Sequence, residues 1–393
     1  MISVEEALAR VLSLSPALPS ESVPLRSAAG RVLARPVAAR LTQPPFPASA
    51  MDGYAIRDAD HVNGASLTVI GEAGAGHAFA GVLAPGQAVR IFTGAPVPEG
   101  ADRVVLQEDV TRVGDSITLT GSLESGTNIR PAGQDFREGD ILSAPRRLRP
   151  ADLALIASMN HPTVDVARKP IVAFLATGDE LVMPGETPRP DQIVASNSFA
   201  LAALAEAAGA EARLLPIARD NDTALRYAFG LAEGADVIVT IGGASVGDHD
   251  LVGKIATELG LERAFWKIAM RPGKPLMAGR LGRAVMLGLP GNPVSAIVCA
   301  HLFLLPLLMQ MQGLAGRHET KMARLGAPVD ANGPRTHYMR ARLEPGEGMP
   351  ILTPFDRQDS ALLSILSRAD ALLIRPIGDG PQPAGSLVSY LPL

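Results

Sequence analysis

The sequence contains a single cysteine, Cys299, which lies within an apolar run. One thiol supports neither a disulfide framework nor a cysteine-based zinc site, and it suits a reducing, cytoplasmic compartment. The seven histidines are scattered without the spacing of metal ligands. The net charge of only −4 favours neither nucleic acid nor a membrane surface as a partner. Any anion-binding site must therefore be local.

Long apolar runs are also scarce. The one run that could cross a membrane, residues 294–311, contains His301 and Pro306 and directly follows a Pro/Gly turn, so we expect a buried core helix and no membrane span. A signal peptide is not expected, because Ser3 and Glu6 form a capping box that opens an amphipathic helix.

Several catalytic motifs are missing from the part of the sequence that alternates between strands and helices. It has no Gly-x-Gly-x-x-Gly, no Walker A motif, no Gly-x-Ser-x-Gly elbow and no nucleophile–histidine constellation. A dinucleotide-binding Rossmann domain and a P-loop kinase are therefore disfavoured.

The chain, at 393 residues, is too long for one core and predicts roughly two to four domains. Residues 41–130 read as a β-rich insert, because short alternating runs are separated by Gly/Pro turns. Helical pattern resumes after the insert, so residues 1–40 and 131–168 are predicted to form one discontinuous linking domain. Residues 169–316 are predicted to be an α/β domain and residues 317–393 a small β-barrel-like domain.

The predicted α/β domain alternates regularly between strand and helix. Such alternation predicts a doubly wound sheet with mainly parallel strands, so the whole chain is classed as multidomain α/β plus β. The expected strands are 170–176, 212–218, 235–240, 264–269 and 284–288, and the expected helices are 198–208, 222–232, 249–259 and 294–311.

A glycine-rich stretch, residues 240–250, is the centre of this domain. It joins a β-branched buried strand to a helix, and Gly242, Gly243 and Gly247 allow the backbone to approach a ligand closely. The N–H groups at the helix start favour an anion. Asp248 and Asp250 add carboxylates, which beside a phosphate indicate a bridging cation. The alternative is an ordinary tight turn with a helix-capping aspartate.

Four more loops follow predicted strands, and the carboxyl ends of parallel strands meet at one edge of a sheet. Acidic and basic side chains are expected together at this edge, which suggests a phosphorylated substrate with Mg²⁺. Each residue also has an ordinary alternative as a helix cap, a solvated turn or a loop-shaping proline. The acidic residues are Asp179, Glu180, Asp220, Asp248 and Asp250, the basic ones Arg271 and Lys274, and the last loop is Leu289–Ser295.

Six motifs in order then identify a resemblance that covers essentially the whole chain. The sequence resembles the molybdopterin molybdenumtransferase family, which includes MoeA and the E domain of gephyrin. The motifs are Ser49-Ala-Met-Asp-Gly-Tyr-Ala55, Ile91-Phe-Thr-Gly-Ala95, Thr177-Gly-Asp-Glu-Leu181, Gly242-Gly-Ala-Ser-Val-Gly247 with Asp250, Arg271-Pro-Gly-Lys-Pro275 and Leu289-Pro-Gly-Asn-Pro293.

The resemblance implies the last step of molybdenum cofactor synthesis. The family binds adenylyl-molybdopterin and molybdate, inserts molybdenum at the dithiolene and releases AMP with the help of Mg²⁺. It also implies an elongated homodimer whose active sites are shared between protomers. Transient contact with the molybdopterin adenylyltransferase and with molybdoenzyme maturation factors is expected.

The resemblance also implies roles for individual residues. Glu180 and Asp250 match the Mg²⁺ and phosphate-cleaving pair, and Asp220 matches an active-site carboxylate. Asp52, Thr93 and Asp135 match functional positions contributed across the dimer. The implied substrate contacts are Ser245, Gly242, Gly243, Gly247, Asp179, Arg271, Lys274, Pro275, Pro290, Gly291, Asn292 and Pro293, with Arg335, Arg340 and Ser360 as contacts to molybdate.

Two departures from the family pattern are small. Ala244 stands where valine is common, and Arg271 stands where lysine is common. Arginine in place of lysine changes the geometry of an oxyanion contact but keeps the positive charge. Two rival functions stay open, a molybdopterin adenylyltransferase and a non-catalytic molybdopterin-binding scaffold. The choice between molybdate and tungstate also stays open, since the two oxyanions are nearly isosteric.

Overall fold

The computed structural model describes residues 1–121, 125–243 and 251–393. They form two compact units. The first unit comprises Met1–Glu21, Gly30–Ala34 and Val166–Leu393, and the second comprises Ser22–Ala29 and Arg35–Asp165.

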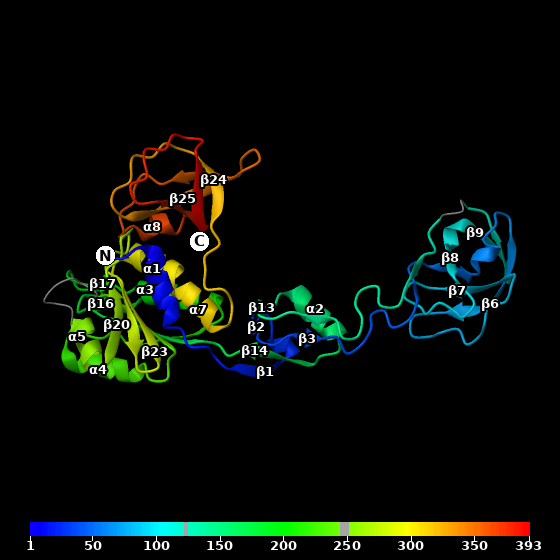
Figure 1. Cartoon of the computed structure of the whole chain (residues 1–393), viewed down its shortest axis with the longest axis horizontal. Coiled ribbons are helices and arrows are strands. Elements are labelled where there is room, and N and C mark those ends of the chain that lie inside the picture. Colours follow the sequence, from blue (N-terminus) through cyan, green and yellow to red (C-terminus); the bar gives the residue numbers. More distant parts are fainter. Residues whose placement is uncertain (122–124, 244–250) are drawn as a thin grey trace. The chain divides into compact units, whose positions relative to one another are not determined.

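The first unit is built on a six-stranded sheet with the order β18-β15-β19-β23-β22-β20 (Figure 1). The first four strands of this order pair in parallel, whereas β22 is antiparallel to both β23 and β20. The two reversals bring β20 back to the direction of the parallel strands. The strands are β15 (Ile171–Ala176), β18 (Glu211–Leu214), β19 (Val237–Ile241), β20 (Leu261–Trp266), β22 (Met277–Leu281) and β23 (Ala284–Leu289).

Helices cover both faces of this sheet, which confirms the doubly wound prediction. Phe174 and Leu287 point into a core shared with α3 (Asn197–Ala207), α6 (Pro293–Cys299) and α7 (Leu305–Met311). Leu175 and Met286, their chain neighbours, point to the other face and pack in a core with α4 (Asp222–Leu231) and α5 (Leu251–Glu258). This alternation follows from the two-residue period of a strand.

Helix α1 (Val4–Ser13) begins at the predicted cap, where the Ser3 Oγ accepts a hydrogen bond from the Glu6 N–H at 3.1 Å. Its apolar stripe, Val4, Ala7 and Val11, is buried in the same core as α3 and α7. The predicted linking domain began at residue 1, whereas this helix packs within the first unit, because its apolar stripe completes the core there.

The apolar run Pro293–Met311 forms α6, a π-helical turn η4 (Ala300–Leu304) and α7. Within the described ranges it is the one helix long and apolar enough to cross a membrane, and 78% of its apolar window is buried inside the fold. Burial to this extent agrees with the predicted core helix, because the run packs against the sheet.

The C-terminal part of the first unit is a small closed β-barrel, as predicted (Figure 1). Strand β25 pairs with both β26 and β27 and thereby closes the ring. The short strand β21 (Met270–Arg271) adds to the barrel by pairing in parallel with β25. The barrel elements are β24 (Lys321–Leu325), β25 (Thr336–Glu344), β26 (Ile351–Pro354), α8 (Leu363–Leu366), β27 (Ala371–Arg375) and β28 (Leu387–Pro392).

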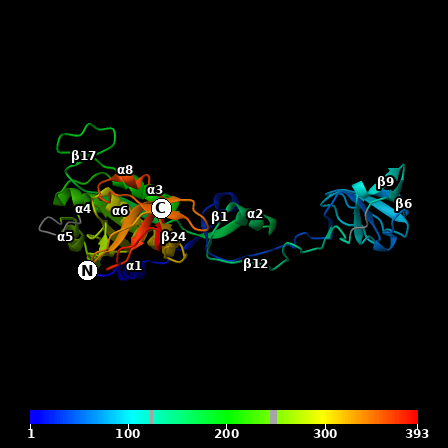
Figure 2. The ribbon, with the colours of Figure 1, turned by 90° about the horizontal axis from the view of Figure 1, so that it is seen from above.

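Two short parallel strands, β16 (Leu181–Val182) and β17 (Ile193–Val194), follow strand β15 in the chain. The loop that joins them extends away from the main sheet (Figure 2). The two strands and their loop, called here the β16–β17 arm, supply one wall of the candidate site.

The second unit contains a six-stranded sheet with the order β8-β5-β7-β6-β10-β9, and it is β-rich as predicted. Its strands are β5 (Gly53–Ile56), β6 (Ser66–Ala73), β7 (Gln87–Ile91), β8 (Arg103–Leu106), β9 (Val110–Val113) and β10 (Ser116–Leu119). The remaining short elements before residue 168 are β1 (Ser20–Pro24), β2 (Val32–Leu33), β3 (Val37–Ala38), β4 (Ala48–Ser49), β11 (Ile129–Arg130), β12 (Ile141–Leu142), β13 (Arg146–Arg147), α2 (Pro150–Ser158) and β14 (Thr163–Ala167).

Candidate active site

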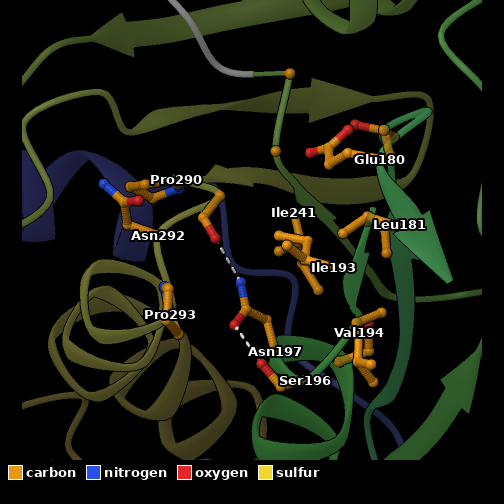
Figure 3. A pocket seen from close by; sticks show the side chains of 18 of the residues that line it. Glu180, Leu181, Ile193, Val194, Ser196, Asn197, Ile241, Pro290, Asn292 and Pro293 are labelled. Atoms are coloured by element: carbon orange, nitrogen blue, oxygen red, sulfur yellow. Dashed lines mark hydrogen bonds between the residues drawn. The ribbon is translucent and has the colours of Figure 1, made fainter. Parts of the chain in front are cut away.

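The carboxyl ends of the central strands open into a cavity of about 490 Å³, shown in Figure 3 and called here the strand-end pocket. Each of the five predicted strand-end loops contributes at least one residue to its lining. The lining residues are Ala176, Thr177, Gly178, Glu180, Leu181, Ile193, Val194, Ala195, Ser196, Asn197, Ser198, Asp220, Ile241, Gly242, Gly243, Pro275, Pro290, Gly291, Asn292 and Pro293.

Two predicted carboxylates, Glu180 and Asp220, line the pocket, and Asp179 lies beside them. The Asp179 Oδ1 accepts a hydrogen bond from the Asp220 backbone N–H at 3.3 Å. Burial raises the pKa of Asp220, and the neighbouring charges of Asp179 and Glu180 raise it further. A hydrogen bond with the Asp179 backbone opposes these effects in part. The pocket thus holds closely spaced negative charge that favours a cation or a proton.

Glycines allow the turn after β19 to lie close to the turn after β15. Gly242 and Gly243 have φ angles of +89° and +65°, which L side chains rarely adopt. A Cβ at Gly242 would meet the Thr177 carbonyl oxygen at 2.9 Å, and a Cβ at Gly243 would collide with the Val252 side chain. Both positions therefore require glycine by conformation and by space.

The loop before α6 is held in place from two sides. From helix α3, the Asn197 Nδ2 donates to the Gly291 carbonyl at 2.7 Å (Figure 3). From the barrel, Ser360 contacts the same loop, because its Oγ accepts a hydrogen bond from the Asn292 Nδ2 at 3.2 Å. Pro293 stands in the first turn of α6, where its fixed φ favours the helix start.

One wall of the pocket was missed by the sequence analysis. Figure 3 shows Leu181, Ile193 and Val194 of the β16–β17 arm beside Ile241 at the end of β19. They form an apolar part of the lining, to which Ser196 and Asn197 at the start of α3 add polar groups. For the start of α3 a signal was available in the sequence, since the helix that follows a parallel strand begins at the ligand-binding edge of the sheet.

The two predicted basic residues occupy different places. Lys274 is exposed in the loop before β22. Arg271 lines a second cavity of about 460 Å³ at the barrel, together with His337 and Arg375. Burial lowers the pKa of His337 to about 4, and the charges of Arg271 and three other arginines also lower it. Four arginines therefore lie near His337, and Asp330 and Asp356 line the same cavity.

Among the predicted barrel residues, Arg340 is 1% exposed and its guanidinium donates to the carbonyls of Arg357 and Asp359. Arg335 is half-buried at the start of β25, where its carbonyl accepts from the Asn332 Nδ2 at 2.9 Å. Of the three predicted barrel contacts, Ser360 reaches the loop of the strand-end pocket directly.

Two of the predicted residues in the second unit are in contact with each other. The Asp52 Oδ1 accepts hydrogen bonds from the Thr93 N–H at 2.7 Å and from the Thr93 Oγ1 at 2.8 Å. The backbone hydrogen bond, the hydroxyl hydrogen bond and the charge of Arg90, in that order of size, hold the pKa of Asp52 below its usual range. Asp135 is exposed elsewhere in this unit, with its N–H bonded to the Gln43 carbonyl at 3.0 Å.

Arg90 was not predicted as a site residue, yet its position is well fixed. Its guanidinium donates to the Gly53 carbonyl at 3.0 Å and to the Gln107 Oε1 at 2.6 Å. It also lies over the rings of Tyr54 and Phe92, 5.1 and 4.7 Å from the ring centroids. Stacking and hydrogen bonding together hold a permanent cation beside Asp52.

Four predicted residues, Ser245, Gly247, Asp248 and Asp250, lie outside the described residues. Across the described ranges, no group of three or more His, Cys, Asp or Glu side chains is arranged to hold a metal ion. The donor chemistry nonetheless fits Mg²⁺, which prefers carboxylate oxygens, because the carboxylates of Glu180 and Asp220 both line the pocket.

Comparisons with known proteins agree over the whole chain. A protein from Nostoc sp. named molybdopterin molybdenumtransferase is 36% identical over 412 aligned residues, which cover 100% of this chain and 94% of that protein. The chain belongs to the molybdopterin molybdenumtransferase family. The Bacillus subtilis protein of the same name is 32% identical and covers 99% of this chain and 94% of its own length.

Solved structures and family models agree with this membership. The molybdopterin biosynthesis MoeA protein of Pyrococcus horikoshii has a TM-score of 0.86 and 28% identity, with 100% of both chains covered. Residues 2–160 match the MoeA N-terminal region (domain I and II), and residues 322–393 match the MoeA C-terminal region (domain IV). Residues 173–310 match a probable molybdopterin binding domain, and this range contains the whole strand-end pocket.

Proposed function

We propose that the protein is a molybdopterin molybdenumtransferase, an enzyme that inserts molybdenum into molybdopterin during synthesis of the molybdenum cofactor. The observation that carries this proposal is the strand-end pocket. Five loops of the matched molybdopterin-binding region meet there around Glu180 and Asp220. A binding scaffold would not require carboxylates whose mutual repulsion the fold must tolerate.

The substrate is proposed to be adenylyl-molybdopterin. Water adds to the adenylyl phosphorus, the bond to the molybdopterin phosphate breaks, and AMP leaves. Asp220 is suited to accept the proton from that water, because burial and its acidic neighbours raise its pKa. The glycines at 242 and 243 bring backbone close to the phosphates, and Asp179 holds the Asp220 loop by its 3.3 Å hydrogen bond.

A magnesium ion is proposed to be held by Glu180, with Asp250 as the predicted second ligand. When bound, such an ion neutralises charge on the phosphoanhydride. The Glu180 carboxylate lies over Gly178, where a Cβ would collide with it. The ion would also relieve the repulsion among Asp179, Glu180 and Asp220.

Molybdate, the second substrate, is proposed to bind toward the barrel. It is a tetrahedral dianion, and four arginines that could attract it lie near His337 at this end of the barrel, namely Arg271, Arg335, Arg340 and Arg375. Ser360 connects this region to the pocket through its hydrogen bond with Asn292. Lys274, which is exposed in the preceding loop, is proposed to help attract the anion.

The working enzyme is proposed to be a cytoplasmic homodimer with shared active sites. In this arrangement the second unit of one protomer supplies Asp52, Thr93 and Asp135 to the strand-end pocket of its partner. The contact between Asp52 and Thr93 supports a joint role, because the two residues lie in different motifs and meet only in the fold.

Reconstitution tests this function. The purified protein is incubated with adenylyl-molybdopterin, molybdate and Mg²⁺, and the product is offered to a molybdenum-free apoenzyme that needs the cofactor. Recovery of apoenzyme activity only when molybdate is present is the expected result. ATP-dependent formation of adenylyl-molybdopterin would instead identify an adenylyltransferase, and tight binding without turnover would identify a scaffold.

A further inference from the structure

A buried arginine in the barrel is bound to one short segment of the chain. Arg340, in strand β25, is 1% exposed, and burial of a guanidinium is costly unless its N–H groups are paired. Its Nη1 donates to the Asp359 carbonyl at 2.8 Å, and its Nη2 donates to the Arg357 carbonyl at 3.4 Å. Its Nε donates to the Gln358 Oε1 at 3.2 Å. All three contacts fall on residues 357–359.

The side-chain amide of Gln358 also binds the backbone of Arg340 and of Phe355. Its Oε1 also accepts from the Arg340 backbone N–H at 3.0 Å. Its Nε2 donates to the Arg340 carbonyl at 3.0 Å and to the Phe355 carbonyl at 2.7 Å. Four hydrogen bonds use the full donor and acceptor capacity of a primary amide.

The position of these bonds explains their effect on the chain. Strands β25 and β26 pair as far as Ala341 and Pro354, and the Phe355 N–H then donates to the Arg340 carbonyl at 3.0 Å. At this pair the Gln358 amide bridges the two chain segments, since it accepts from the Arg340 N–H and donates to the Phe355 carbonyl. It therefore holds the chain at the point where it leaves the barrel.

Two residues further on, this segment reaches the strand-end pocket. The Ser360 carbonyl accepts from the Val294 N–H at 3.1 Å, and the Ser360 Oγ accepts from the Asn292 Nδ2 at 3.2 Å. Asn292 lines the pocket, and Val294 is in the first turn of α6. Arg340 and the Gln358 amide thus hold together the segment that leads to the pocket.

We propose that Gln358 is a positioning residue that binds Arg340 to residues 357–359, so that Ser360 meets the pocket loop, and in this way adjusts the contact with the oxyanion substrate. This inference rests on the proposed function for its kinetic part only. Among the described residues, the side-chain hydrogen bonds of Gln358 go to Arg340 and Phe355, so it is proposed to act through the segment that they hold.

The test compares Gln358→Met with Gln382→Met. Methionine keeps the length and apolar bulk of the side chain but removes all four hydrogen bonds of Gln358. Gln382, in the same barrel, donates to the Asp379 Oδ1 at 3.0 Å and serves as the matched control. Gln358→Glu keeps the acceptor for Arg340, and it provides a second variant if the methionine variant does not fold.

Hydrogen exchange gives a readout that needs no activity. In Gln358→Met we expect the Val294 and Phe355 amides to exchange at least about tenfold faster, with Gln382→Met unchanged and Gln358→Glu intermediate. In turnover assays the KM for molybdate should rise about tenfold or more, while the KM for adenylyl-molybdopterin stays as in wild type.

Two results would overturn the inference. One is unchanged exchange at Val294 in a folded Gln358 variant. The other is a uniform loss in which melting temperature, kcat and both KM values change together, as for a purely structural residue. If the wild-type protein shows no molybdate-dependent turnover, the proposed function fails, whereas the exchange measurement still decides the positioning role.

Discussion

Asp220 is a pocket carboxylate whose ionisation the fold opposes, since burial, Asp179 and Glu180 all raise its pKa. The folded protein binds this proton more tightly than the unfolded chain does. The bound proton on Asp220 therefore stabilises the folded protein at pH values below the unfolded pKa of this carboxyl. This stabilisation is lost as the pH rises through the higher pKa that Asp220 has in the folded protein. Asp220→Asn should melt at a higher temperature than wild type at pH 7 and lose activity.

Asp222, two residues away, provides the matched control, because its substitution should change the melting temperature in the opposite direction. Its pKa is lowered, chiefly by the side-chain hydrogen bond from Arg226, so Asp222→Asn should melt at a lower temperature at pH 7. Calorimetric scans between pH 4 and pH 8 measure both variants. Equal shifts of the same sign would contradict this account of the pocket.

Thr93 provides the second prediction at this scale. Its hydroxyl and N–H both donate to the Asp52 Oδ1, and these contacts lower the pKa of Asp52. The ionised carboxylate therefore stabilises the folded protein at pH values above the unfolded pKa, and this stabilisation is lost as the pH falls through the folded pKa. Thr93→Val removes the hydroxyl contact but leaves the larger backbone contact. The pKa of Asp52 should rise toward its usual value, which an NMR titration of the carboxyl group measures.

The control for this variant is Thr111→Val, in the exposed strand β9 of the same unit. It should leave the titration of Asp52 as in wild type. An unchanged Asp52 titration in Thr93→Val would show that the hydroxyl contact does not set the ionisation of this carboxylate.

At the scale of elements, the turn after β19 must stay close to the turn after β15. Gly242→Ala places a methyl group 2.9 Å from the Thr177 carbonyl oxygen in a backbone with φ of +89°. Gly260→Ala has a similar φ of +97°, but its new methyl group meets no described atom within 4 Å. Both variants carry the cost of left-handed backbone, and Gly242→Ala should lose about 1–3 kcal/mol more in urea unfolding. Equal losses would contradict the tight approach.

Most of the elements could be predicted from the sequence, because the parallel strands β15, β19 and β23 are short runs rich in buried apolar residues. Strand β22 could not, since Met277–Leu281 contains an alanine, a glycine and an arginine with little strand preference. The glycine there, Gly279, is needed because a Cβ would collide with the Glu262 carbonyl of β20. The glycine is thus required by a tertiary contact, and a tertiary contact cannot be predicted from the local sequence pattern.

The candidate site was predictable to the same degree. Loops at strand ends could be assigned, so Glu180, Asp220 and the residues around Asn292 were expected at one edge, and the structure places them around one pocket. Asn197 and Gln358 were missed, because their importance comes from side-chain hydrogen bonds to distant backbone groups. Nothing in the local sequence of Gln358 distinguishes it from a solvent-exposed amide.

At the scale of the whole molecule, each of the two units holds part of the proposed site. If the site is shared between protomers, two inactive variants should complement each other in a mixed dimer. Asp52→Asn and Glu180→Gln should each inactivate a homodimer. Mixed dimers with both variants would contain one intact site of two, so a random mixture should recover roughly a quarter of wild-type activity. Co-expression with two affinity tags, followed by an activity assay, measures this recovery. No recovery in isolated mixed dimers would place both residues in one protomer's site.

Release of AMP from adenylyl-molybdopterin by the purified protein tests the central claim most directly. The assay is run with and without molybdate and Mg²⁺ on the wild type, on Glu180→Gln and on the exposed control Glu233→Gln. We expect release that requires both additions in wild type and in Glu233→Gln, and a loss of at least about a hundredfold in Glu180→Gln. Full AMP release by Glu180→Gln, or release by the wild type that is independent of molybdate, would contradict the account.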